Sequence, residues 1–224
     1  MKSERVKLKA DDGHELDAYV AKPESDPIAG LVVVQEIFGV NAHIRSVADG
    51  YARDGFLAVA PALFDRAERG VELKYEGEDA QRARLFYGRI KMGDMLRDTA
   101  AAIDYARSQG GKKTGIIGYC LGGSIAWTAA VRFKVDAAVA YYGGQIPQHA
   151  SEQLHCPVML HFGKKDQHIP QEAVEKIRQP HPEVPIHLYD AGHGFNCDVR
   201  ASYDAASAKL ARERSLEFLK KNLS

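Results

Sequence analysis

Short, mostly apolar runs recur along this chain and are separated by stretches of helical period. Runs of this kind are typical of strands that are buried on both faces of a parallel sheet. They cover residues 29–36, 56–60, 114–118, 135–141 and 157–162, and a further short strand is predicted at 186–189.

Near the N-terminus, residues 5–9 and 16–20 alternate between apolar and polar side chains on either side of the turn Asp11-Asp12-Gly13. This pattern predicts a hairpin at the edge of the sheet.

Amphipathic stretches connect the predicted strands. Asn41 is expected to cap the first helix, in which Ile44, Ala48 and Tyr51 share one face. Further helices are predicted around residues 96–106, 121–131 and 171–179, and from about residue 202 onward. Strands that alternate with helices indicate an α/β protein. About eight strands, in a mostly parallel sheet with helices on both faces, are the layout of an α/β-hydrolase fold.

No internal repeat or linker interrupts the chain, so a single domain over residues 1–224 is expected. Residues 64–93 are an exception to the regular alternation, because they are polar and strongly charged. An insertion of this length in an α/β domain is often a lid or a pocket wall. A solvated, charged helix is the alternative.

Composition narrows the possible partners. Lys plus Arg equals Asp plus Glu, at 30 each, which indicates neither nucleic acid nor an acidic membrane surface as a partner. No apolar run is long enough to span a bilayer, and no signal-peptide pattern is present at the N-terminus. The three cysteines cannot all pair, which favours a reducing cytoplasm. A monomer or a small homo-oligomer is expected.

The pentapeptide Gly118-Tyr-Cys-Leu-Gly122 lies between an apolar run and a helical stretch. A Gly-x-nucleophile-x-Gly turn in this context predicts a nucleophile elbow, which exposes the central side chain above the sheet. Here that side chain is the thiol of Cys120. Its place at a helix N-terminus favours the thiolate and the stabilisation of an oxyanion. The sequence therefore predicts an enzyme with a cysteine nucleophile.

A thiol nucleophile needs a base and an acid that orients the base. In this fold the chain order is nucleophile, acid, histidine. Asp166 and His193 follow later predicted strands in that order, and His193 is flanked by glycines. Asp166 could instead cap the next helix, and His168 competes with His193 for the role of base. No group of His, Cys and carboxylate residues has metal-ligand spacing, so no metal is expected.

Gln35-Glu36-Ile37-Phe38-Gly39 follows the central strand, where this fold places its second oxyanion donor. The backbone N–H groups of Ile37 and Leu121 are the predicted oxyanion hole. Glu36 is an acid at the end of a buried strand. It either pairs with an arginine or faces the Cys120 thiol, and the residues alone do not separate these roles.

These segments resemble the dienelactone hydrolase (carboxymethylenebutenolidase) family. The resemblance covers most of the chain and rests on residues 35–41, 118–123, 138–143 and 191–195. It implies an α/β-hydrolase fold, a triad of Cys120, Asp166 and His193, no cofactor, and hydrolysis of an unsaturated lactone that carries a carboxylate. It also implies that Glu36 keeps the thiol neutral until substrate arrives.

The chain departs from the family at the arginines that grip the substrate carboxylate. Cys197 stands four residues after His193, where the family has one of these arginines, and Arg200 is the nearest arginine downstream. The second arginine falls in 64–93, where Arg82 is the nearest candidate and Arg84 the next. The residues expected to line the substrate site are Phe38, Arg82, Arg84, Tyr87, Tyr142, Phe195 and Arg200.

Three other functions stay open. A general carboxylesterase or thioesterase would use the same scaffold on another ester. A glutamine amidotransferase also uses a Gly-x-Cys-x-Gly turn, but such enzymes carry a glutamate two residues after the histidine, where this chain has Phe195. A hydrolase-fold protein that binds a ligand without turnover would not need all three triad residues.

Overall fold

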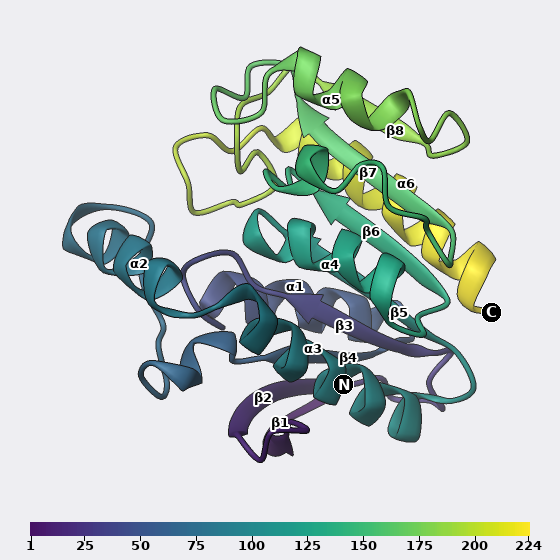
Figure 1. The fold of residues 1–224 in the computed structure, drawn as a ribbon. Helices are drawn as coiled ribbons and strands as arrows, with labels where there is room; N and C mark the ends of the chain where they lie inside the picture. Colours follow the sequence, from purple (N-terminus) through teal and green to yellow (C-terminus); the bar gives the residue numbers. More distant parts are fainter. The chain divides into compact units, whose positions relative to one another are not determined.

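The computed structural model describes all residues from 1 to 224. The chain divides into two compact units, residues 1–116 with residue 224, and residues 117–223 (Figure 1). The first unit contains β1 (Lys2–Lys9), β2 (Glu15–Lys22), β3 (Gly30–Val34), α1 (Ala42–Arg53), β4 (Leu57–Pro61), the 3-10 helix η1 (Leu63–Arg66), α2 (Gly77–Arg89) and α3 (Met92–Gly110).

Strand β5 (Thr114–Tyr119) begins in the first unit and ends in the second. The second unit continues with α4 (Leu121–Arg132), β6 (Ala137–Tyr141), η2 (Ile146–Gln148), β7 (Val158–Gly163), α5 (Gln171–Arg178), β8 (Ile186–Tyr189) and α6 (Ala205–Leu223). The predicted eight strands, with the elbow after the fifth, are confirmed.

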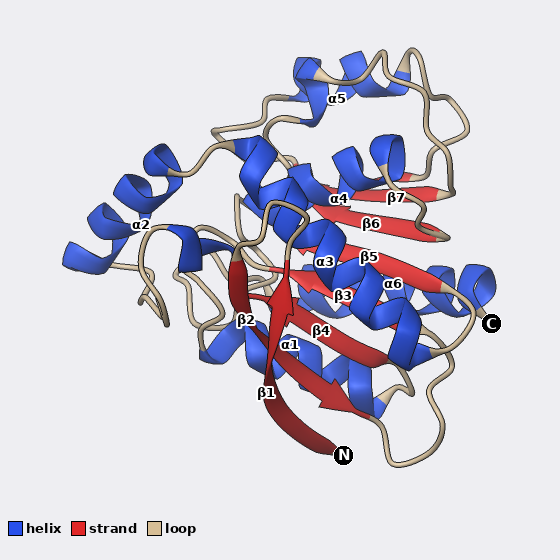
Figure 2. Cartoon of the chain, turned by 60° about the horizontal axis from the view of Figure 1, so that its bottom comes forward, coloured by secondary structure: helices blue, strands red, loops and turns tan.

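In the first unit the strand order is β1-β2-β4-β3. The hairpin β1–β2 is antiparallel and β1 lies at the edge, as the alternating pattern predicts, whereas β3 and β4 are parallel. Helices α1 and α3 pack against β3 and β4, and Figure 2 shows them on opposite faces of these strands. The predicted cap of α1 is confirmed, because the Asn41 side chain accepts a hydrogen bond from the N–H of Ile44 at 3.2 Å.

In the second unit the strand order is β5-β6-β7-β8, and the pairs β6–β7 and β7–β8 are parallel. Helix α4 packs against β6, and α6 packs against β6 and β7 from the opposite face (Figure 1). The carboxyl ends of parallel strands meet at one edge of a sheet, where this fold class places its sites. Residues that follow β5, β7 and β8 are therefore brought together.

Residues 64–93 agree with the alternative of a solvated, charged helix, and the last helix begins slightly later than expected. This segment includes most of η1, all of α2 and the first two residues of α3, and α2 extends away from the strands of its unit (Figure 2). Only Ala83 and Phe86 of α2 are buried, which gives a largely solvated helix, while a role as a lid stays a prediction. Helix α6 begins at Ala205 instead of near 202, because Asp204 caps it by accepting the N–H of Ser207 at 2.8 Å.

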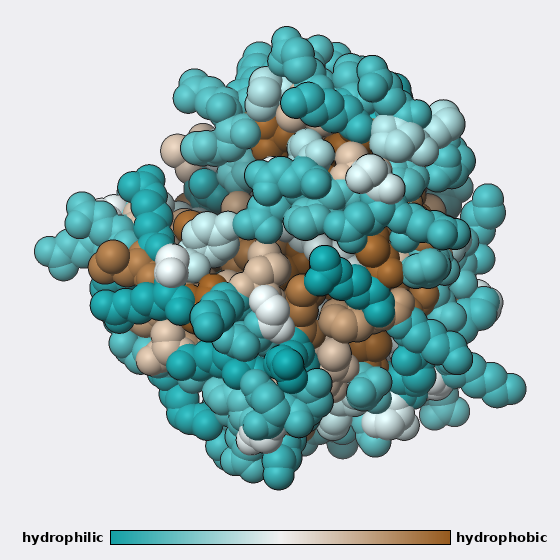
Figure 3. Space-filling model, viewed as in Figure 1, coloured by the Kyte–Doolittle hydropathy of each residue, from teal (hydrophilic) through white to brown (hydrophobic).

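The surface of the protein is described by its hydropathy. The face shown in Figure 3 is mostly hydrophilic, with small and separate hydrophobic areas. None of the helices combines the length and the apolar composition that a membrane-spanning segment requires.

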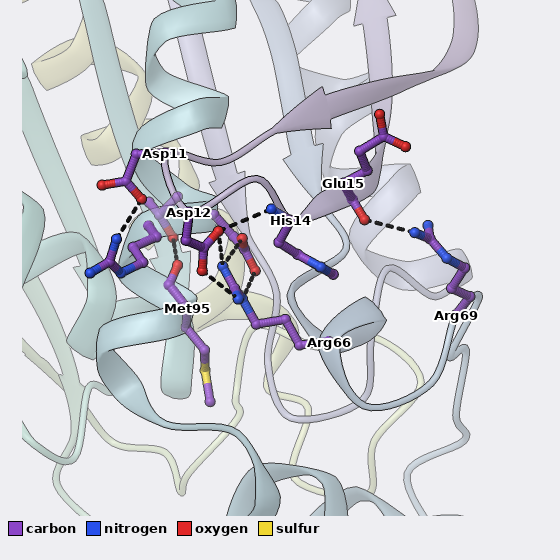
Figure 4. A network of polar contacts seen from close by, with 10 residues as sticks. Asp11, Asp12, His14, Glu15, Arg66, Arg69 and Met95 are labelled. Carbon is purple, nitrogen blue, oxygen red and sulfur yellow. Dashed lines mark hydrogen bonds and ion pairs between the residues drawn. The ribbon is translucent and has the colours of Figure 1, made fainter.

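A buried ion pair fastens the β1–β2 turn within the first unit (Figure 4). The Arg66 guanidinium donates to both carboxylate oxygens of Asp98 at 2.8 Å, and it also donates to Asp12 at 2.9 Å. The Asp98 side chain is fully buried, and that of Arg66 is 14% exposed. Burial raises the pKa of Asp98 against the opposing effect of Arg66. Arg66 therefore offsets the free-energy cost of burying the negative charge of Asp98.

We expect Arg66→Met to lower the free energy of unfolding by about 3–5 kcal/mol, because it leaves the Asp98 carboxylate buried without its partner. The measurement is chemical denaturation followed by circular dichroism. Arg97→Met is the matched control, since the Arg97–Asp11 pair is exposed at 47% and 72% and its loss should change stability little. Equal effects of the two substitutions would contradict the prediction.

Candidate active site

The turn between β5 and α4 places Cys120 in a strained conformation. Cys120 has φ 54° and ψ −111°, in the left-handed half of the map that non-glycine residues rarely occupy. The flanking glycines allow this bend, because a Cβ at Gly118 would lie 1.9 Å from the carbonyl oxygen of Gly122. The backbone N–H of Cys120 donates to the carbonyl of Tyr141 on β6 at 3.0 Å. The turn has the geometry predicted for a nucleophile elbow, and the role of Cys120 as the nucleophile stays a prediction.

Cys120, Asp166 and His193 meet within the second unit. The Cys120 Sγ lies 3.2 Å from His193 Nε2, and His193 Nδ1–H donates to Asp166 Oδ2 at 2.7 Å. Cys120 follows β5, Asp166 follows β7 and His193 follows β8. This is the geometry of a nucleophile, a base and an acid that orients the base.

Asp166 uses both carboxylate oxygens. While Oδ2 accepts from His193, Oδ1 accepts the backbone N–H groups of His168 and Ile169 at 2.8 and 3.2 Å. The Asp166 side chain is fully buried and does not cap α5, whose N-cap is Pro170. The turn therefore holds the carboxylate still, and the carboxylate holds the imidazole.

His193, and not His168, contacts the thiol. The His168 side chain is exposed, and its ring stands edge-on to the His193 ring with centroids 5.1 Å apart. Burial by itself lowers the pKa of His193, but the hydrogen bonds to Asp166 and Cys120 outweigh it and raise the pKa to about 10. An imidazolium at this position favours a thiolate partner.

Helix α4 begins directly after Cys120, at Leu121. The first N–H groups of an α-helix have no partner within it, and the helix dipole favours negative charge there. The Leu121 N–H is therefore suited to an oxyanion, as the sequence predicts. The close packing of this end depends on Gly123, where a Cβ would lie 2.4 Å from the carbonyl of Tyr141.

A buried aromatic cluster supports the imidazole. Tyr142 has φ 38° and is fully buried, and its ring centroid lies 5.0 Å from that of His193. Phe195 is also fully buried and contacts Tyr142 and Tyr189. Both residues lie beside the predicted triad, and their contact with substrate stays a prediction.

The loop after His193 folds back on itself. The N–H groups of Cys197 and Arg200 donate to the carbonyls of Gly194 and Cys197 at 3.0 and 3.1 Å. These turns lay the Arg200 guanidinium over Gly194, where an added Cβ would lie 2.6 Å from Nη1. Cys197 is fully buried. A cation is thus provided next to His193 by Arg200 and not by the residue at position 197.

The remaining predicted site residues belong to the first unit. Glu36 is buried at 1% exposure directly after β3, and Ile37 lies in the following turn. Phe38 is buried against Tyr75, with ring centroids 4.3 Å apart.

Helix α2 carries the other three predicted residues. Arg84 and Tyr87 are exposed, and Arg82 pairs with Glu68 at 3.2 Å and Asp79 at 3.8 Å. The roles of all six first-unit residues stay predictions.

A buried polar chain that was not predicted from the sequence links β6, β7, β8 and α6 in the second unit. His161 on β7 bonds Tyr189 Oη at 2.8 Å and Ser215 Oγ at 3.0 Å, and Ser215 bonds Tyr141 Oη at 2.8 Å. Burial lowers the pKa of His161 well below its usual value, so the ring is neutral. A histidine in the middle of an apolar strand was the available signal, because a buried ring nitrogen needs a partner.

Comparison with known proteins shows the family of the chain. The sequence matches the Dienelactone hydrolase family over residues 16–223. The chain belongs to the dienelactone hydrolase family. It is 34% identical to a carboxymethylenebutenolidase of Pseudomonas putida, over 98% of this chain and 97% of that protein. It is 30% identical to carboxymethylenebutenolidase 1 of Cupriavidus pinatubonensis, with the same coverage.

A solved structure shows the same fold. The crystal structure of a candidate dienelactone hydrolase from Klebsiella pneumoniae subsp. pneumoniae MGH 78578 matches with a TM-score of 0.85 and 31% identity. The match covers 97% of this chain and 98% of that chain. Membership of the family makes this protein an α/β-hydrolase-fold enzyme that hydrolyses carboxylic ester or lactone bonds.

The pKa of His193 provides a test of the thiol–imidazole contact. We expect His193 to titrate near pH 10 in the wild type and at a lower pH in Cys120→Ala, because the substitution removes one of the groups that stabilise the imidazolium. The measurement is NMR titration of the ring nitrogens. The pKa of His187, which burial lowers, should stay the same in both proteins. An unchanged His193 pKa in Cys120→Ala would mean that the contact carries no charge interaction.

The raised pKa of His193 also makes the free energy of unfolding depend on pH. The folded-state pKa of about 10 exceeds the ordinary value of 6.5, so the folded state binds more protons between these values. The contribution of His193 to stability is complete below pH 6.5 and is lost as the pH rises through about 10. In Cys120→Ala, whose His193 should have a lower folded-state pKa, the total loss of stability should be smaller and should be complete at a lower pH.

Proposed function

We propose that this enzyme hydrolyses its ester or lactone substrate through a covalent thioester on Cys120. The observation that carries the proposal is the line of contacts from Cys120 Sγ to His193 Nε2, at 3.2 Å, and from His193 Nδ1 to Asp166 Oδ2, at 2.7 Å. The strained backbone conformation of Cys120 and its place at a helix N-terminus support the same role.

In the first half of the reaction the Cys120 thiolate attacks the carbonyl carbon, and a C–S bond forms. The Leu121 N–H stabilises the oxyanion, and the Ile37 N–H is the proposed second donor. The tetrahedral intermediate then collapses and the C–O bond to the leaving group breaks. The His193 imidazolium gives its proton to the departing alkoxide or enolate, which leaves a thioester.

In the second half, neutral His193 takes a proton from water, and the hydroxide attacks the thioester carbonyl. The C–S bond breaks, the carboxylic acid departs and Cys120 returns as the thiolate beside the imidazolium. Asp166 keeps the ring oriented throughout. Glu36 is proposed to control the ionisation of the thiol before substrate arrives. The reaction requires neither a metal nor a cofactor.

The proposed substrate is a dienelactone-type molecule that carries a carboxylate. The names of the relatives from Pseudomonas putida and Cupriavidus pinatubonensis support this substrate class. Within the chain, the Arg200 guanidinium over Gly194 supports it, because a guanidinium binds a carboxylate through two parallel hydrogen bonds.

A general carboxylesterase or thioesterase is the second candidate. It is favoured by one observation, the fully buried Cys197 at the position where the resemblance implies a carboxylate-binding arginine. Neutral esters would then be the better substrates. A cytoplasmic location and a monomeric or small homo-oligomeric state are also retained as proposals.

Replacement of the base should separate the two histidines. We expect His193→Gln to lower kcat/KM for an activated aryl ester by at least about 1,000-fold, because it removes the proton acceptor next to Cys120. His168→Gln is the matched control and should keep most of the activity, since its side chain only stands beside the His193 ring.

Cys120→Ala should abolish turnover. Mass spectrometry after an acid quench should find an acyl group on Cys120 of the wild-type protein and no acylation of the Cys120→Ala protein. Full activity of Cys120→Ala would rule out the proposed nucleophile.

The carboxylate preference can be tested separately from the chemistry. We expect Arg200→Gln to raise the KM for cis- or trans-dienelactone by about 10- to 100-fold, since a charge-assisted hydrogen-bonded pair is lost. The same variant should hydrolyse phenyl acetate, which has no carboxylate, at the wild-type rate. Arg82→Ala and Arg84→Ala test the two alternative arginines. Equal losses on both substrates would show that Arg200 only supports the loop.

A further inference from the structure

A second concave site lies in the second unit, at the starts of β7 and β8. Its volume is about 890 Å³, which is within the usual range for small-molecule sites. Val158, Met159, Val184 and Phe218 contribute apolar surface to it. Asp166 and His193 follow the ends of the same parallel strands. The groove and the triad are therefore at opposite edges of these strands, and the groove takes no part in the proposed reaction.

The groove contains a cation without an acidic partner. Arg214 on α6 is half-buried and lines the groove. Its guanidinium makes one hydrogen bond, from Nη1 to the neutral Tyr189 hydroxyl at 3.2 Å, and lies 5.6 Å from the centroid of that ring. It makes no ion pair. A guanidinium has five N–H donors, and a partly buried one is stabilised by a carboxylate.

The other charges of the groove leave this cation available. Glu183 is already bonded to His181 at 3.2 Å, and Glu217 is exposed at the rim without an ion pair to Arg214. Burial and the charge of Arg214 lower the pKa of His187, so its ring is neutral there. Lys221 lies two helical turns after Arg214 on the same face of α6 and adds a second cation.

The thiol in the groove is not a second nucleophile. Burial and the carboxylate of Asp136 raise the pKa of Cys156 to about 12, so it stays protonated at neutral pH. The groove thus offers an apolar surface, an unpaired guanidinium and no reactive group. These features are suited to binding and not to catalysis.

We propose that this groove is a second binding site, for a small molecule with an apolar body and a carboxylate that pairs with Arg214. The apolar part would cover the surface around Met159 and Phe218, and the carboxylate would use the N–H donors that Tyr189 leaves unused. Because the site does not include the triad, the proposal is independent of the thioester mechanism.

Methionine methyl groups provide the measurement. The four methionines are Met1, Met92, Met95 and Met159, and only Met159 lines the groove. Sodium octanoate is titrated into Cys120→Ala protein with 13C-methyl methionine, so that no turnover can occur. We expect a saturable shift of the Met159 signal, with the other three signals unchanged. Octanamide, which has the same chain and no charge, should bind at least tenfold more weakly.

Variants assign the binding to Arg214. Arg214→Met should weaken octanoate binding at least tenfold and leave octanamide binding unchanged, while Arg214→Lys should retain part of the preference for octanoate. Arg178→Met, on the exposed side of α5, is the matched control and should bind both probes as the parent does. If Arg214→Met does not fold, the comparison of the two probes on the parent protein still decides the question.

Three results would overturn the proposal. The first is an unshifted Met159 signal, including a case in which only His193 responds because octanoate binds at the triad. The second is equal affinity for octanoate and octanamide. The third is a Met159 shift that depends on protein concentration and not on the probe, which would assign the groove to a second copy of this chain.

Discussion

The hydrogen bond from His193 to Asp166 is the interaction on which the candidate site depends. One oxygen of a buried carboxylate is held by two backbone N–H groups of its own turn, and the other orients the imidazole toward the thiol. Loss of this bond would deprive the buried carboxylate of its cationic partner and leave the imidazole ring free to rotate. The same bond raises the pKa of His193, so orientation and charge have a common origin. A thiolate at Cys120 would gain from both, because a cation held close to it adds to the stabilisation that a helix N-terminus provides.

The elbow adds a conformational cost that the surrounding structure must offset. Cys120 and Tyr142 are the only residues other than glycine with positive φ, and they directly follow the neighbouring strands β5 and β6. Each such residue costs on the order of 1–3 kcal/mol, and it persists only where packing leaves no alternative. Here the packing comes from close backbone approaches at Gly118 and Gly123 and from the bond between the Cys120 N–H and Tyr141. Strain at these two positions brings the thiol and an aromatic face to the same imidazole.

Much of the fold and of the triad could be predicted because their signals are local. A glycine on each side of Cys120, an apolar run before it and a helical stretch after it define the elbow, and strand ends locate Asp166 and His193. Pairings between distant positions could not be predicted in this way. Arg66 binds Asp12 and Asp98, which are 54 and 32 residues away, and His161 binds Ser215, which is 54 residues away. Such pairs depend on the packing of whole elements, and charge or polarity alone does not select one partner among many.

The predicted carboxylate-binding arginine lies in a loop, and loops are the part of a structure that sequence patterns describe least well. Strands and the elbow place the residues of the predicted triad, whereas the Arg200 guanidinium beside Gly194 comes from a loop that returns through consecutive turns. Those turns bury Cys197 and lay Arg200 on Gly194, so a guanidinium is present although it is supplied from a different position in the chain. A loop can move a charge in this way without disturbing the triad, because Asp166 and not the loop orients the imidazole. The chemistry of the site can therefore persist while the shape and charge of its substrate change.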